Sequence, residues 1–170
     1  MTTKKSVRTL VVLALIAGVG FAPSANAATK PTVTQKLQLQ YLVEEEKLAR
    51  DVYAYLATNT TTQKFSNITR SEQTHMDQIA AVLKTYNFFN PTLSRAPGVF
   101  RDAELQGLYN DLIVKGSADY TSAMGVGVAI EELDISDLAK MIGPSMPADM
   151  KLALDNLMRG SVNHLAAFKR

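Results

Sequence analysis

Residues 69–86 read TRSEQTHMDQIAAVLKTY. The apolar side chains of this stretch recur at intervals of three and four, the period of an amphipathic helix, at Met76, Ile79, Val82 and Leu83. Glu72 and His75 lie three residues apart and fall on the same helical face as these apolar residues. Both polar side chains therefore point toward the core, where a buried charge needs a partner or a metal ion.

The same period predicts three further long helices, over residues 35–57, 118–141 and 147–168, and a shorter helix over 102–115. Asparagine, proline and glycine residues separate these segments, and Ser117 is the expected N-cap of the helix over 118–141. No stretch shows a convincing strand pattern. We therefore expect an all-α protein.

The connections between the long helices indicate how these helices are arranged. The first and last connections are short, whereas the connection between the second and third long helices is long and carries the short helix. This order is typical of a four-helix bundle with one long crossover. We expect such a bundle, antiparallel, with the short helix as a lid or brace on the crossover.

The first 27 residues have the features of a secretory signal peptide. Three basic residues precede an uncharged apolar run from Leu10 to Ala22, and an Ala-x-Ala site follows that ends at Ala27. The run is too short to be a dependable membrane span. We expect cleavage after Ala27, export to the periplasm or the medium, and one domain over residues 28–170. An uncleaved anchor helix is the alternative.

Charge and composition exclude several classes of function. The chain has 18 Lys and Arg residues and 16 Asp and Glu residues, and three of the basic ones lie in the predicted signal, which leaves 15 against 16. A nearly neutral mature chain gives no electrostatic basis for binding nucleic acid. Cysteine is absent, which excludes disulfides, thiolate metal ligands and a cysteine nucleophile.

Polar residues interrupt the apolar face of every long helix. Glu45 and Glu46 do so on the first helix, where helical projection places Glu45 nearer the centre of the face. Glu131 and Asp134 lie three residues apart on the apolar face of the third helix, and His164 lies on that of the fourth. Together with the pair on the second long helix, each helix offers at least one group that can bind a metal ion.

Each of these residues also has a purely structural explanation. Residues 69–72 fit a capping box, residues 44–47 are typical of a solvated face, and a lone inward histidine is more often hydrogen-bonded than metal-bound. Inward charges can also form salt bridges with Lys47, Arg50 and Arg159, in a non-catalytic bundle that acts by binding a partner or as a structural protein. Four coincident interruptions favour a metal site.

Four blocks of the sequence resemble a bacterial ferritin-like family of unknown function. They are EEEKLARDVY at 44–53, FSNITRSEQTHM at 65–76, VGVAIEELDISDL at 126–138 and RGSVNHLAAF at 159–168. More distantly, the first block is similar to the first-helix pattern of rubrerythrins, in which the corresponding glutamate binds iron. This similarity favours Glu46, whereas helical projection favours Glu45, and both remain candidates.

The resemblance implies a ferritin-like four-helix bundle with a carboxylate and histidine metal site. The candidate ligands are Glu45, Glu46, Glu72, His75, Glu131, Asp134 and His164. This set suits two iron or manganese ions, with zinc at part of the set as an alternative. We expect metal ions as partners, leave a homodimer open, and expect oxygen or peroxide chemistry if the ions are redox-active.

Ser161 and Tyr53 lie near the expected site without being candidate ligands. Ferritin-like di-iron proteins usually repeat Glu-x-x-His on the last helix, whereas Ser161 occupies the glutamate position of this chain. Close helix packing at Gly160 and Ser161, with Asp134 as the substitute carboxylate, would compensate. The hydroxyl of Tyr53 is expected at the rim of the bundle, with a place near the metal site as an electron or proton donor as the alternative.

Overall fold

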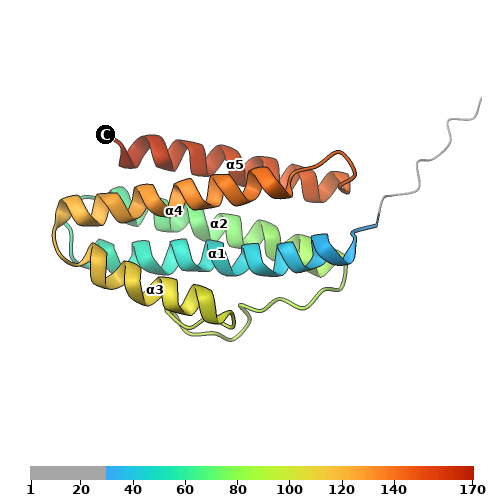
Figure 1. The fold of residues 1–170 in the computed structure, drawn as a ribbon, viewed down its shortest axis with the longest axis horizontal. Helices are drawn as coiled ribbons and strands as arrows, with labels where there is room; N and C mark the ends of the chain where they lie inside the picture. Colours follow the sequence, from blue (N-terminus) through green and yellow to red (C-terminus); the bar gives the residue numbers. More distant parts are fainter. Residues whose placement is uncertain (1–29) are drawn as a thin grey trace, which may run out of the picture.

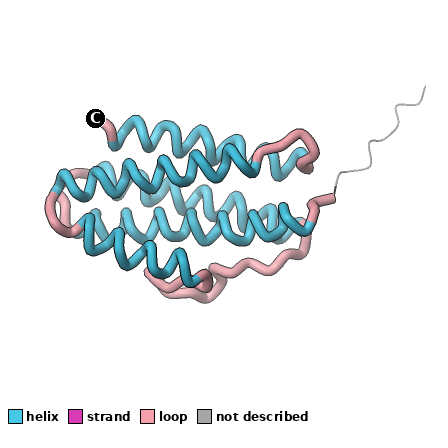
Figure 2. Tube along the Cα trace, in the orientation of Figure 1, coloured by secondary structure: helices cyan, strands magenta, loops and turns pink. Residues whose placement is uncertain are grey.

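The computed structural model describes residues 30–170, so the predicted signal peptide and its cleavage site lie outside the described residues. This part of the chain forms five helices: α1 (Val33–Thr58), α2 (Lys64–Thr85), α3 (Ala103–Gly116), α4 (Tyr120–Met141) and α5 (Ala148–Phe168). Figure 2 shows helices and loops only over these residues, which confirms the all-α prediction. None of the five helices is long and apolar enough to cross a membrane.

Four of the helices form a bundle in which each helix packs against two others. Contacts join α1 to α2, α2 to α5, α5 to α4 and α4 to α1. Neighbouring helices run in opposite directions, and α3 lies along α1 and α4 (Figure 1). Because the long connection between α2 and α4 carries α3, the predicted bundle with a helical crossover is confirmed.

The start of α2 differs from the prediction. The helix begins at Lys64, five residues before the expected Thr69. Within the helix, the hydroxyl of Thr69 donates a hydrogen bond of 2.8 Å to the carbonyl oxygen of Phe65. Residues 69–72 therefore do not form a capping box, and the structural explanation of Glu72 as a capping residue is wrong.

The start of α4 also differs, by a few residues. The side chain of Asp119 caps this helix by accepting a hydrogen bond from the amide of Ser122. Ser117 instead ends α3, where its hydroxyl donates to the carbonyl oxygen of Ile113. Serine and aspartate are both favoured N-caps, so the sequence offered two starting points in three residues.

The core of the bundle consists of two apolar clusters with polar side chains between them. Members of the first cluster include Val52, Leu56, Phe65, Ile130 and Phe168. Members of the second include Leu42, Ile79, Leu138, Leu154 and Leu157. Along each bundle helix, the polar interruptions fall between residues of the first cluster and residues of the second, so the helices bring them together at mid-height.

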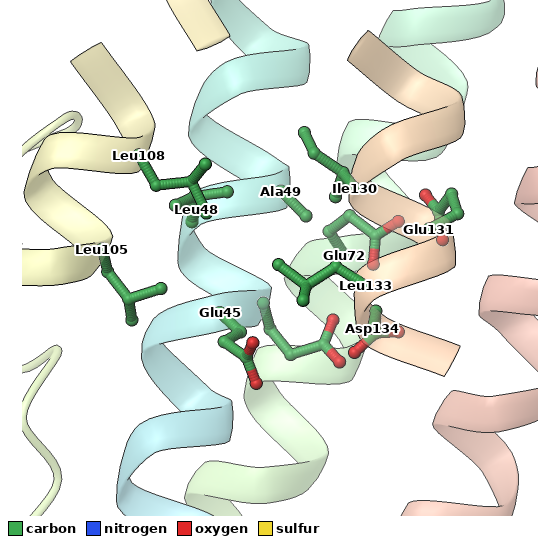
Figure 3. A pocket seen from close by; sticks show the side chains of 11 residues that line it. Glu45, Leu48, Ala49, Glu72, Leu105, Leu108, Ile130, Glu131, Leu133 and Asp134 are labelled. Carbon is green, nitrogen blue, oxygen red and sulfur yellow. The ribbon is translucent and has the colours of Figure 1, made fainter. Parts of the chain in front are cut away.

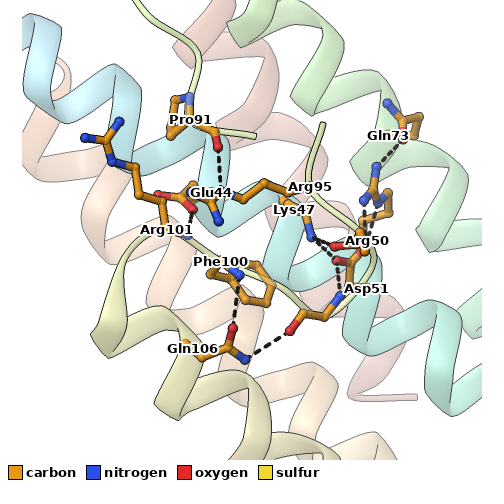
Figure 4. Close-up of polar contacts among 12 residues, drawn as sticks. Glu44, Lys47, Arg50, Asp51, Gln73, Pro91, Arg95, Phe100, Arg101 and Gln106 are labelled. Atoms are coloured by element: carbon orange, nitrogen blue, oxygen red, sulfur yellow. Dashed lines mark hydrogen bonds and ion pairs between the residues drawn. The ribbon is translucent and has the colours of Figure 1, made fainter. Parts of the chain in front are cut away.

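Charged side chains of α1 hold the crossover in place. Glu44 and Asp51 accept hydrogen bonds of 2.5 and 2.9 Å from backbone amides of the crossover. Lys47 donates to a crossover carbonyl at 2.9 Å, and its Nζ lies 4.4 Å from the centre of the Phe100 ring (Figure 4). The alternative interpretation of residues 44–47 as a solvated face is therefore wrong, because all four are buried and the crossover contacts Glu44 and Lys47.

Candidate metal centre

The carboxylate of Glu72 lies between the two histidines of the chain. Its Oε2 is 2.8 Å from Nδ1 of His75, one helical turn away on α2, and its Oε1 is 2.7 Å from Nδ1 of His164 on α5. The imidazole rings are stacked with their centres 5.5 Å apart. Each oxygen of one carboxylate therefore faces a different histidine.

Two further carboxylates complete two groups that share Glu72. Glu46 of α1 has its Oε2 3.2 Å from Nδ1 of His75, and Glu131 of α4 has its Oε1 3.6 Å from Nδ1 of His164. In each group, one candidate ligand atom per residue lies within 4.8 Å of the others. All five side chains are buried. The bundle therefore contains two adjacent groups that could each hold a metal ion.

Neighbouring side chains fix how the second group is oriented. Nε2 of His164 lies 3.0 Å from the hydroxyl of Ser71, so a neutral ring that donates there keeps the lone pair of Nδ1 toward the carboxylates. The hydroxyl of Tyr53 donates a hydrogen bond of 2.7 Å to Glu131. Tyr53 has no exposed surface, so its predicted place at the rim of the bundle is wrong.

Gly160 and Ser161 give α5 its close approach to the site, as expected from the missing glutamate. A Cβ added at Gly160 would lie 2.5 Å from Cε1 of His75 and still closer to Nε2, so only glycine leaves room for this ring. The hydroxyl of Ser161 donates to Asp134. The second group lacks a glutamate from α5, and its two carboxylates come instead from Glu131 and the shared Glu72.

The site holds more carboxyl groups than cations. Burial works against ionisation of Glu72, but its contacts with His164 and His75 lower its pKa to about 2. Burial works against the charged imidazoles, but contacts with carboxylates outweigh it. Glu46 and then Glu72 raise the pKa of His75 to about 10, and Glu131 and then Glu72 raise that of His164 to about 9. Burial raises the pKa of Glu131 to about 7 and that of Glu46 well above its usual range. Without metal, the groups therefore retain protons that a bound cation would displace.

Several buried atoms of the site have no hydrogen-bond partner. Although Nδ1 of His164 and Oε1 of Glu72 are 2.7 Å apart, they are not aligned as a hydrogen bond, and Oε1 of Glu46 is also unpartnered. Unpartnered polar atoms are costly when buried, yet metal ligation requires free lone pairs. The orphaned oxygen and nitrogen atoms therefore fit a bound cation better than they fit a hydrogen-bonded core.

The cations proposed for a salt-bridge network are bound elsewhere. Lys47 pairs with Asp51 at 2.5 Å, and Arg50 pairs with the same carboxylate at 2.7 Å (Figure 4). Arg159 is exposed and donates to Asn156. Among residues 30–170, no lysine or arginine forms a salt bridge with the five residues of the two groups. These carboxylates are thus not neutralised by the expected network.

Two of the predicted ligands, Glu45 and Asp134, lie outside both groups but beside them. They line a pocket together with Glu46, Glu72 and Glu131, and with apolar side chains of α1, α3 and α4 (Figure 3). Burial, followed by the charges of Asp134 and Asp137, raises the pKa of Glu45 to about 9. Of the two alternatives on α1, Glu46 is the residue that the structure places with His75.

Comparison with known proteins identifies relatives without assigning a reaction. Uncharacterized protein MJ0754 from Methanocaldococcus jannaschii is 46% identical over 127 residues, which cover 75% of this chain and 69% of that protein. The crystal structure of hypothetical protein MJ0754 matches with a TM-score of 0.79 and 42% identity, covering 82% of this chain and 79% of the other. Residues 35–170 match the uncharacterized protein domain DUF2202. The chain therefore belongs to the DUF2202 family.

Proposed function

We propose that this protein binds two iron or manganese ions, one in each of the two groups, with the Glu72 carboxylate shared between them. The observation that carries the proposal is the placement of Glu72, whose two oxygens face different histidines at 2.8 and 2.7 Å. Carboxylates with imidazoles are a ligand set that suits these metals, and Glu-x-x-His helices are the units of ferritin-like di-metal bundles. The resemblance of the sequence blocks to ferritin-like proteins and rubrerythrins supports the same assignment.

The side chains around the ligands have defined roles in this proposal. Glu46 and His75 hold one ion, and Glu131 and His164 hold the other. Hydrogen bonds from Tyr53 and to Ser71 keep Glu131 and His164 in place. When bound, a redox-active pair of ions would supply the electrons for reducing oxygen or peroxide, and the pocket beside Glu72 gives a small oxidant access.

Metal content of the purified protein tests the assignment. After supplementation with iron or manganese, elemental analysis should find two ions per chain, and a chelator should lower the melting temperature. His75→Ala and Glu72→Ala should abolish tight binding and keep a helical circular dichroism spectrum, because each removes a ligand. Glu132→Ala, which changes an exposed residue paired with Lys169, is the matched control and should do neither.

Other outcomes point to different functions. Zinc bound at a single group, with no uptake of iron or manganese, would replace a redox role with a structural or hydrolytic one. A supplemented wild-type protein that stays metal-free, with a melting temperature unmoved by chelators, would contradict the proposal. The alternative would then be a non-catalytic bundle whose buried carboxyls hold protons.

A further inference from the structure

Glu45 is a buried carboxylate that the two metal groups do not use. Its exposed fraction is 6%, and neither of its oxygens has a hydrogen-bond partner. Figure 3 shows its carboxylate in the pocket that Asp134 also lines. Because an isolated carboxylate in such a place is unfavourable, it needs either a proton or a cation.

The surroundings of Glu45 are acidic and lead to the surface. Asp134 and Asp137 are three residues apart on α4, so both fall on one face of this helix, and their charges act on Glu45. Oδ1 of Asp134 is also buried and unpartnered. Asp137 has a side chain that is 19% exposed and binds Lys140 at 2.6 Å. Carboxylates therefore extend from the surface of α4 inward to the pocket.

An ion needs such a route because the two metal groups are enclosed. Glu46 and Glu72 are each 2% exposed, and His75 is 5% exposed. The rest of the pocket lining is apolar, including Leu105 and Leu108 of α3, and offers a hydrated cation no ligands. The oxygen-lined side between α1 and α4 is the side on which an ion can exchange its water for carboxylates.

We propose that Glu45, Asp134 and Asp137 form a separate transit site, through which a divalent cation passes from the surface to the two metal groups. The inference rests on the proposed function, since it requires a destination for the ion. The transit site has only oxygen ligands, whereas each inner group adds an imidazole, so Mn²⁺ or Fe²⁺ binds more tightly at the inner groups and moves inward. The carboxylate of Asp137 near the surface also raises the local cation concentration at the mouth of this route.

The rate of Mn²⁺ loading, separated from the final Mn²⁺ content, tests this site. Metal-free protein is mixed with Mn²⁺ alone, and the loss of the aqueous Mn²⁺ electron paramagnetic resonance signal is followed in time. Glu45→Gln and Asp137→Asn should each slow loading by about tenfold or more. Glutamine cannot exchange a proton for the ion, and asparagine lacks the charge that attracts it. Their final content should equal that of the wild type, since the inner groups are unchanged.

Glu132→Gln is the control, because it removes an exposed α4 carboxylate outside the pocket and should load at the wild-type rate. Glu45→Gln loading as fast as the wild type would overturn the transit site and leave the proposed function intact. A final content in Glu45→Gln reduced to about half would make Glu45 a ligand of an inner group, which also overturns it. Wild-type protein that takes up no Mn²⁺ would overturn both proposals.

Discussion

Replacing Glu45 by glutamine in the metal-free protein should make the fold more stable. Burial, with the charges of Asp134 and Asp137, raises the pKa of Glu45 from 4.5 to about 9, and Lys140 only partly offsets this. At pH 7 the folded protein must therefore hold a proton that the unfolded chain releases. The difference of about 2.5 between pH 7 and the pKa of 4.5 in the unfolded chain corresponds to about 3 kcal/mol in the free energy of unfolding. Glutamine has nearly the same shape and no charge, so Glu45→Gln should raise the free energy of unfolding at pH 7 by up to that amount.

The gain should depend on pH in a defined direction. Between pH 4.5 and about 9, the folded wild type binds more protons at Glu45 than the unfolded chain does, so its stability falls as pH rises. The glutamine variant lacks this contribution. Its advantage should thus be absent below pH 4.5, grow through neutral pH and level off above about pH 9.

Urea unfolding in the presence of a chelator, followed by circular dichroism at several pH values, measures this difference. Glu132→Gln serves as the control, since an exposed carboxylate should change stability by less than about 0.5 kcal/mol. A Glu45→Gln protein that is no more stable than the wild type at pH 7 would contradict this prediction. The same refutation would come from identical pH dependence in the two proteins.

Three further predictions follow from the site and the sequence. Gly160→Ala should weaken Mn²⁺ binding about tenfold or more, because a methyl group there displaces the His75 ring. Calorimetry measures the affinity, and an unchanged value would contradict this prediction. Mn²⁺ affinity should rise with pH up to about 9, because the ion must displace protons from His75 and His164, whose pKa values are raised to about 10 and about 9. Calorimetry in buffers of different ionisation enthalpy should detect the released protons. An affinity that stays constant from pH 6 to 9 would argue against this prediction. N-terminal sequencing of the exported protein should find Ala28 first, whereas Met1 on protein extracted from membranes would indicate an uncleaved anchor.

The polar interruptions of the helices were predictable because they are local. Glu72 and His75 are one turn apart on a face whose other members are apolar, and helical geometry alone turns both inward. The same reasoning placed Glu131 and His164 on inward faces, and the structure brings all four together. These residues could be found from sequence because each helix buries one face and this face repeats every three or four residues.

Other features could not be read from periodicity. Glu45 and Glu46 are adjacent and both buried, so a helical projection cannot tell which one reaches His75; the packing of α1 against α2 decides this. The hydroxyl of Tyr53 was expected at the rim, but it lies inside the bundle because α4 places its acceptor Glu131 there. Sequence spacing gives the direction of a side chain around its helix and says nothing of what lies opposite.

Helix periodicity and connection lengths were enough to predict the helical class, the four-helix bundle with its long crossover, and the inward direction of the candidate ligands. Packing between the helices was needed to show that Glu72 lies between two histidines, that the crossover covers Glu44 and Lys47, and that Glu45 has no hydrogen-bond partner. The physical reason is that helix formation and facing depend on residues within a few turns, whereas a shared ligand or an unpaired charge depends on atoms from helices far apart in the chain.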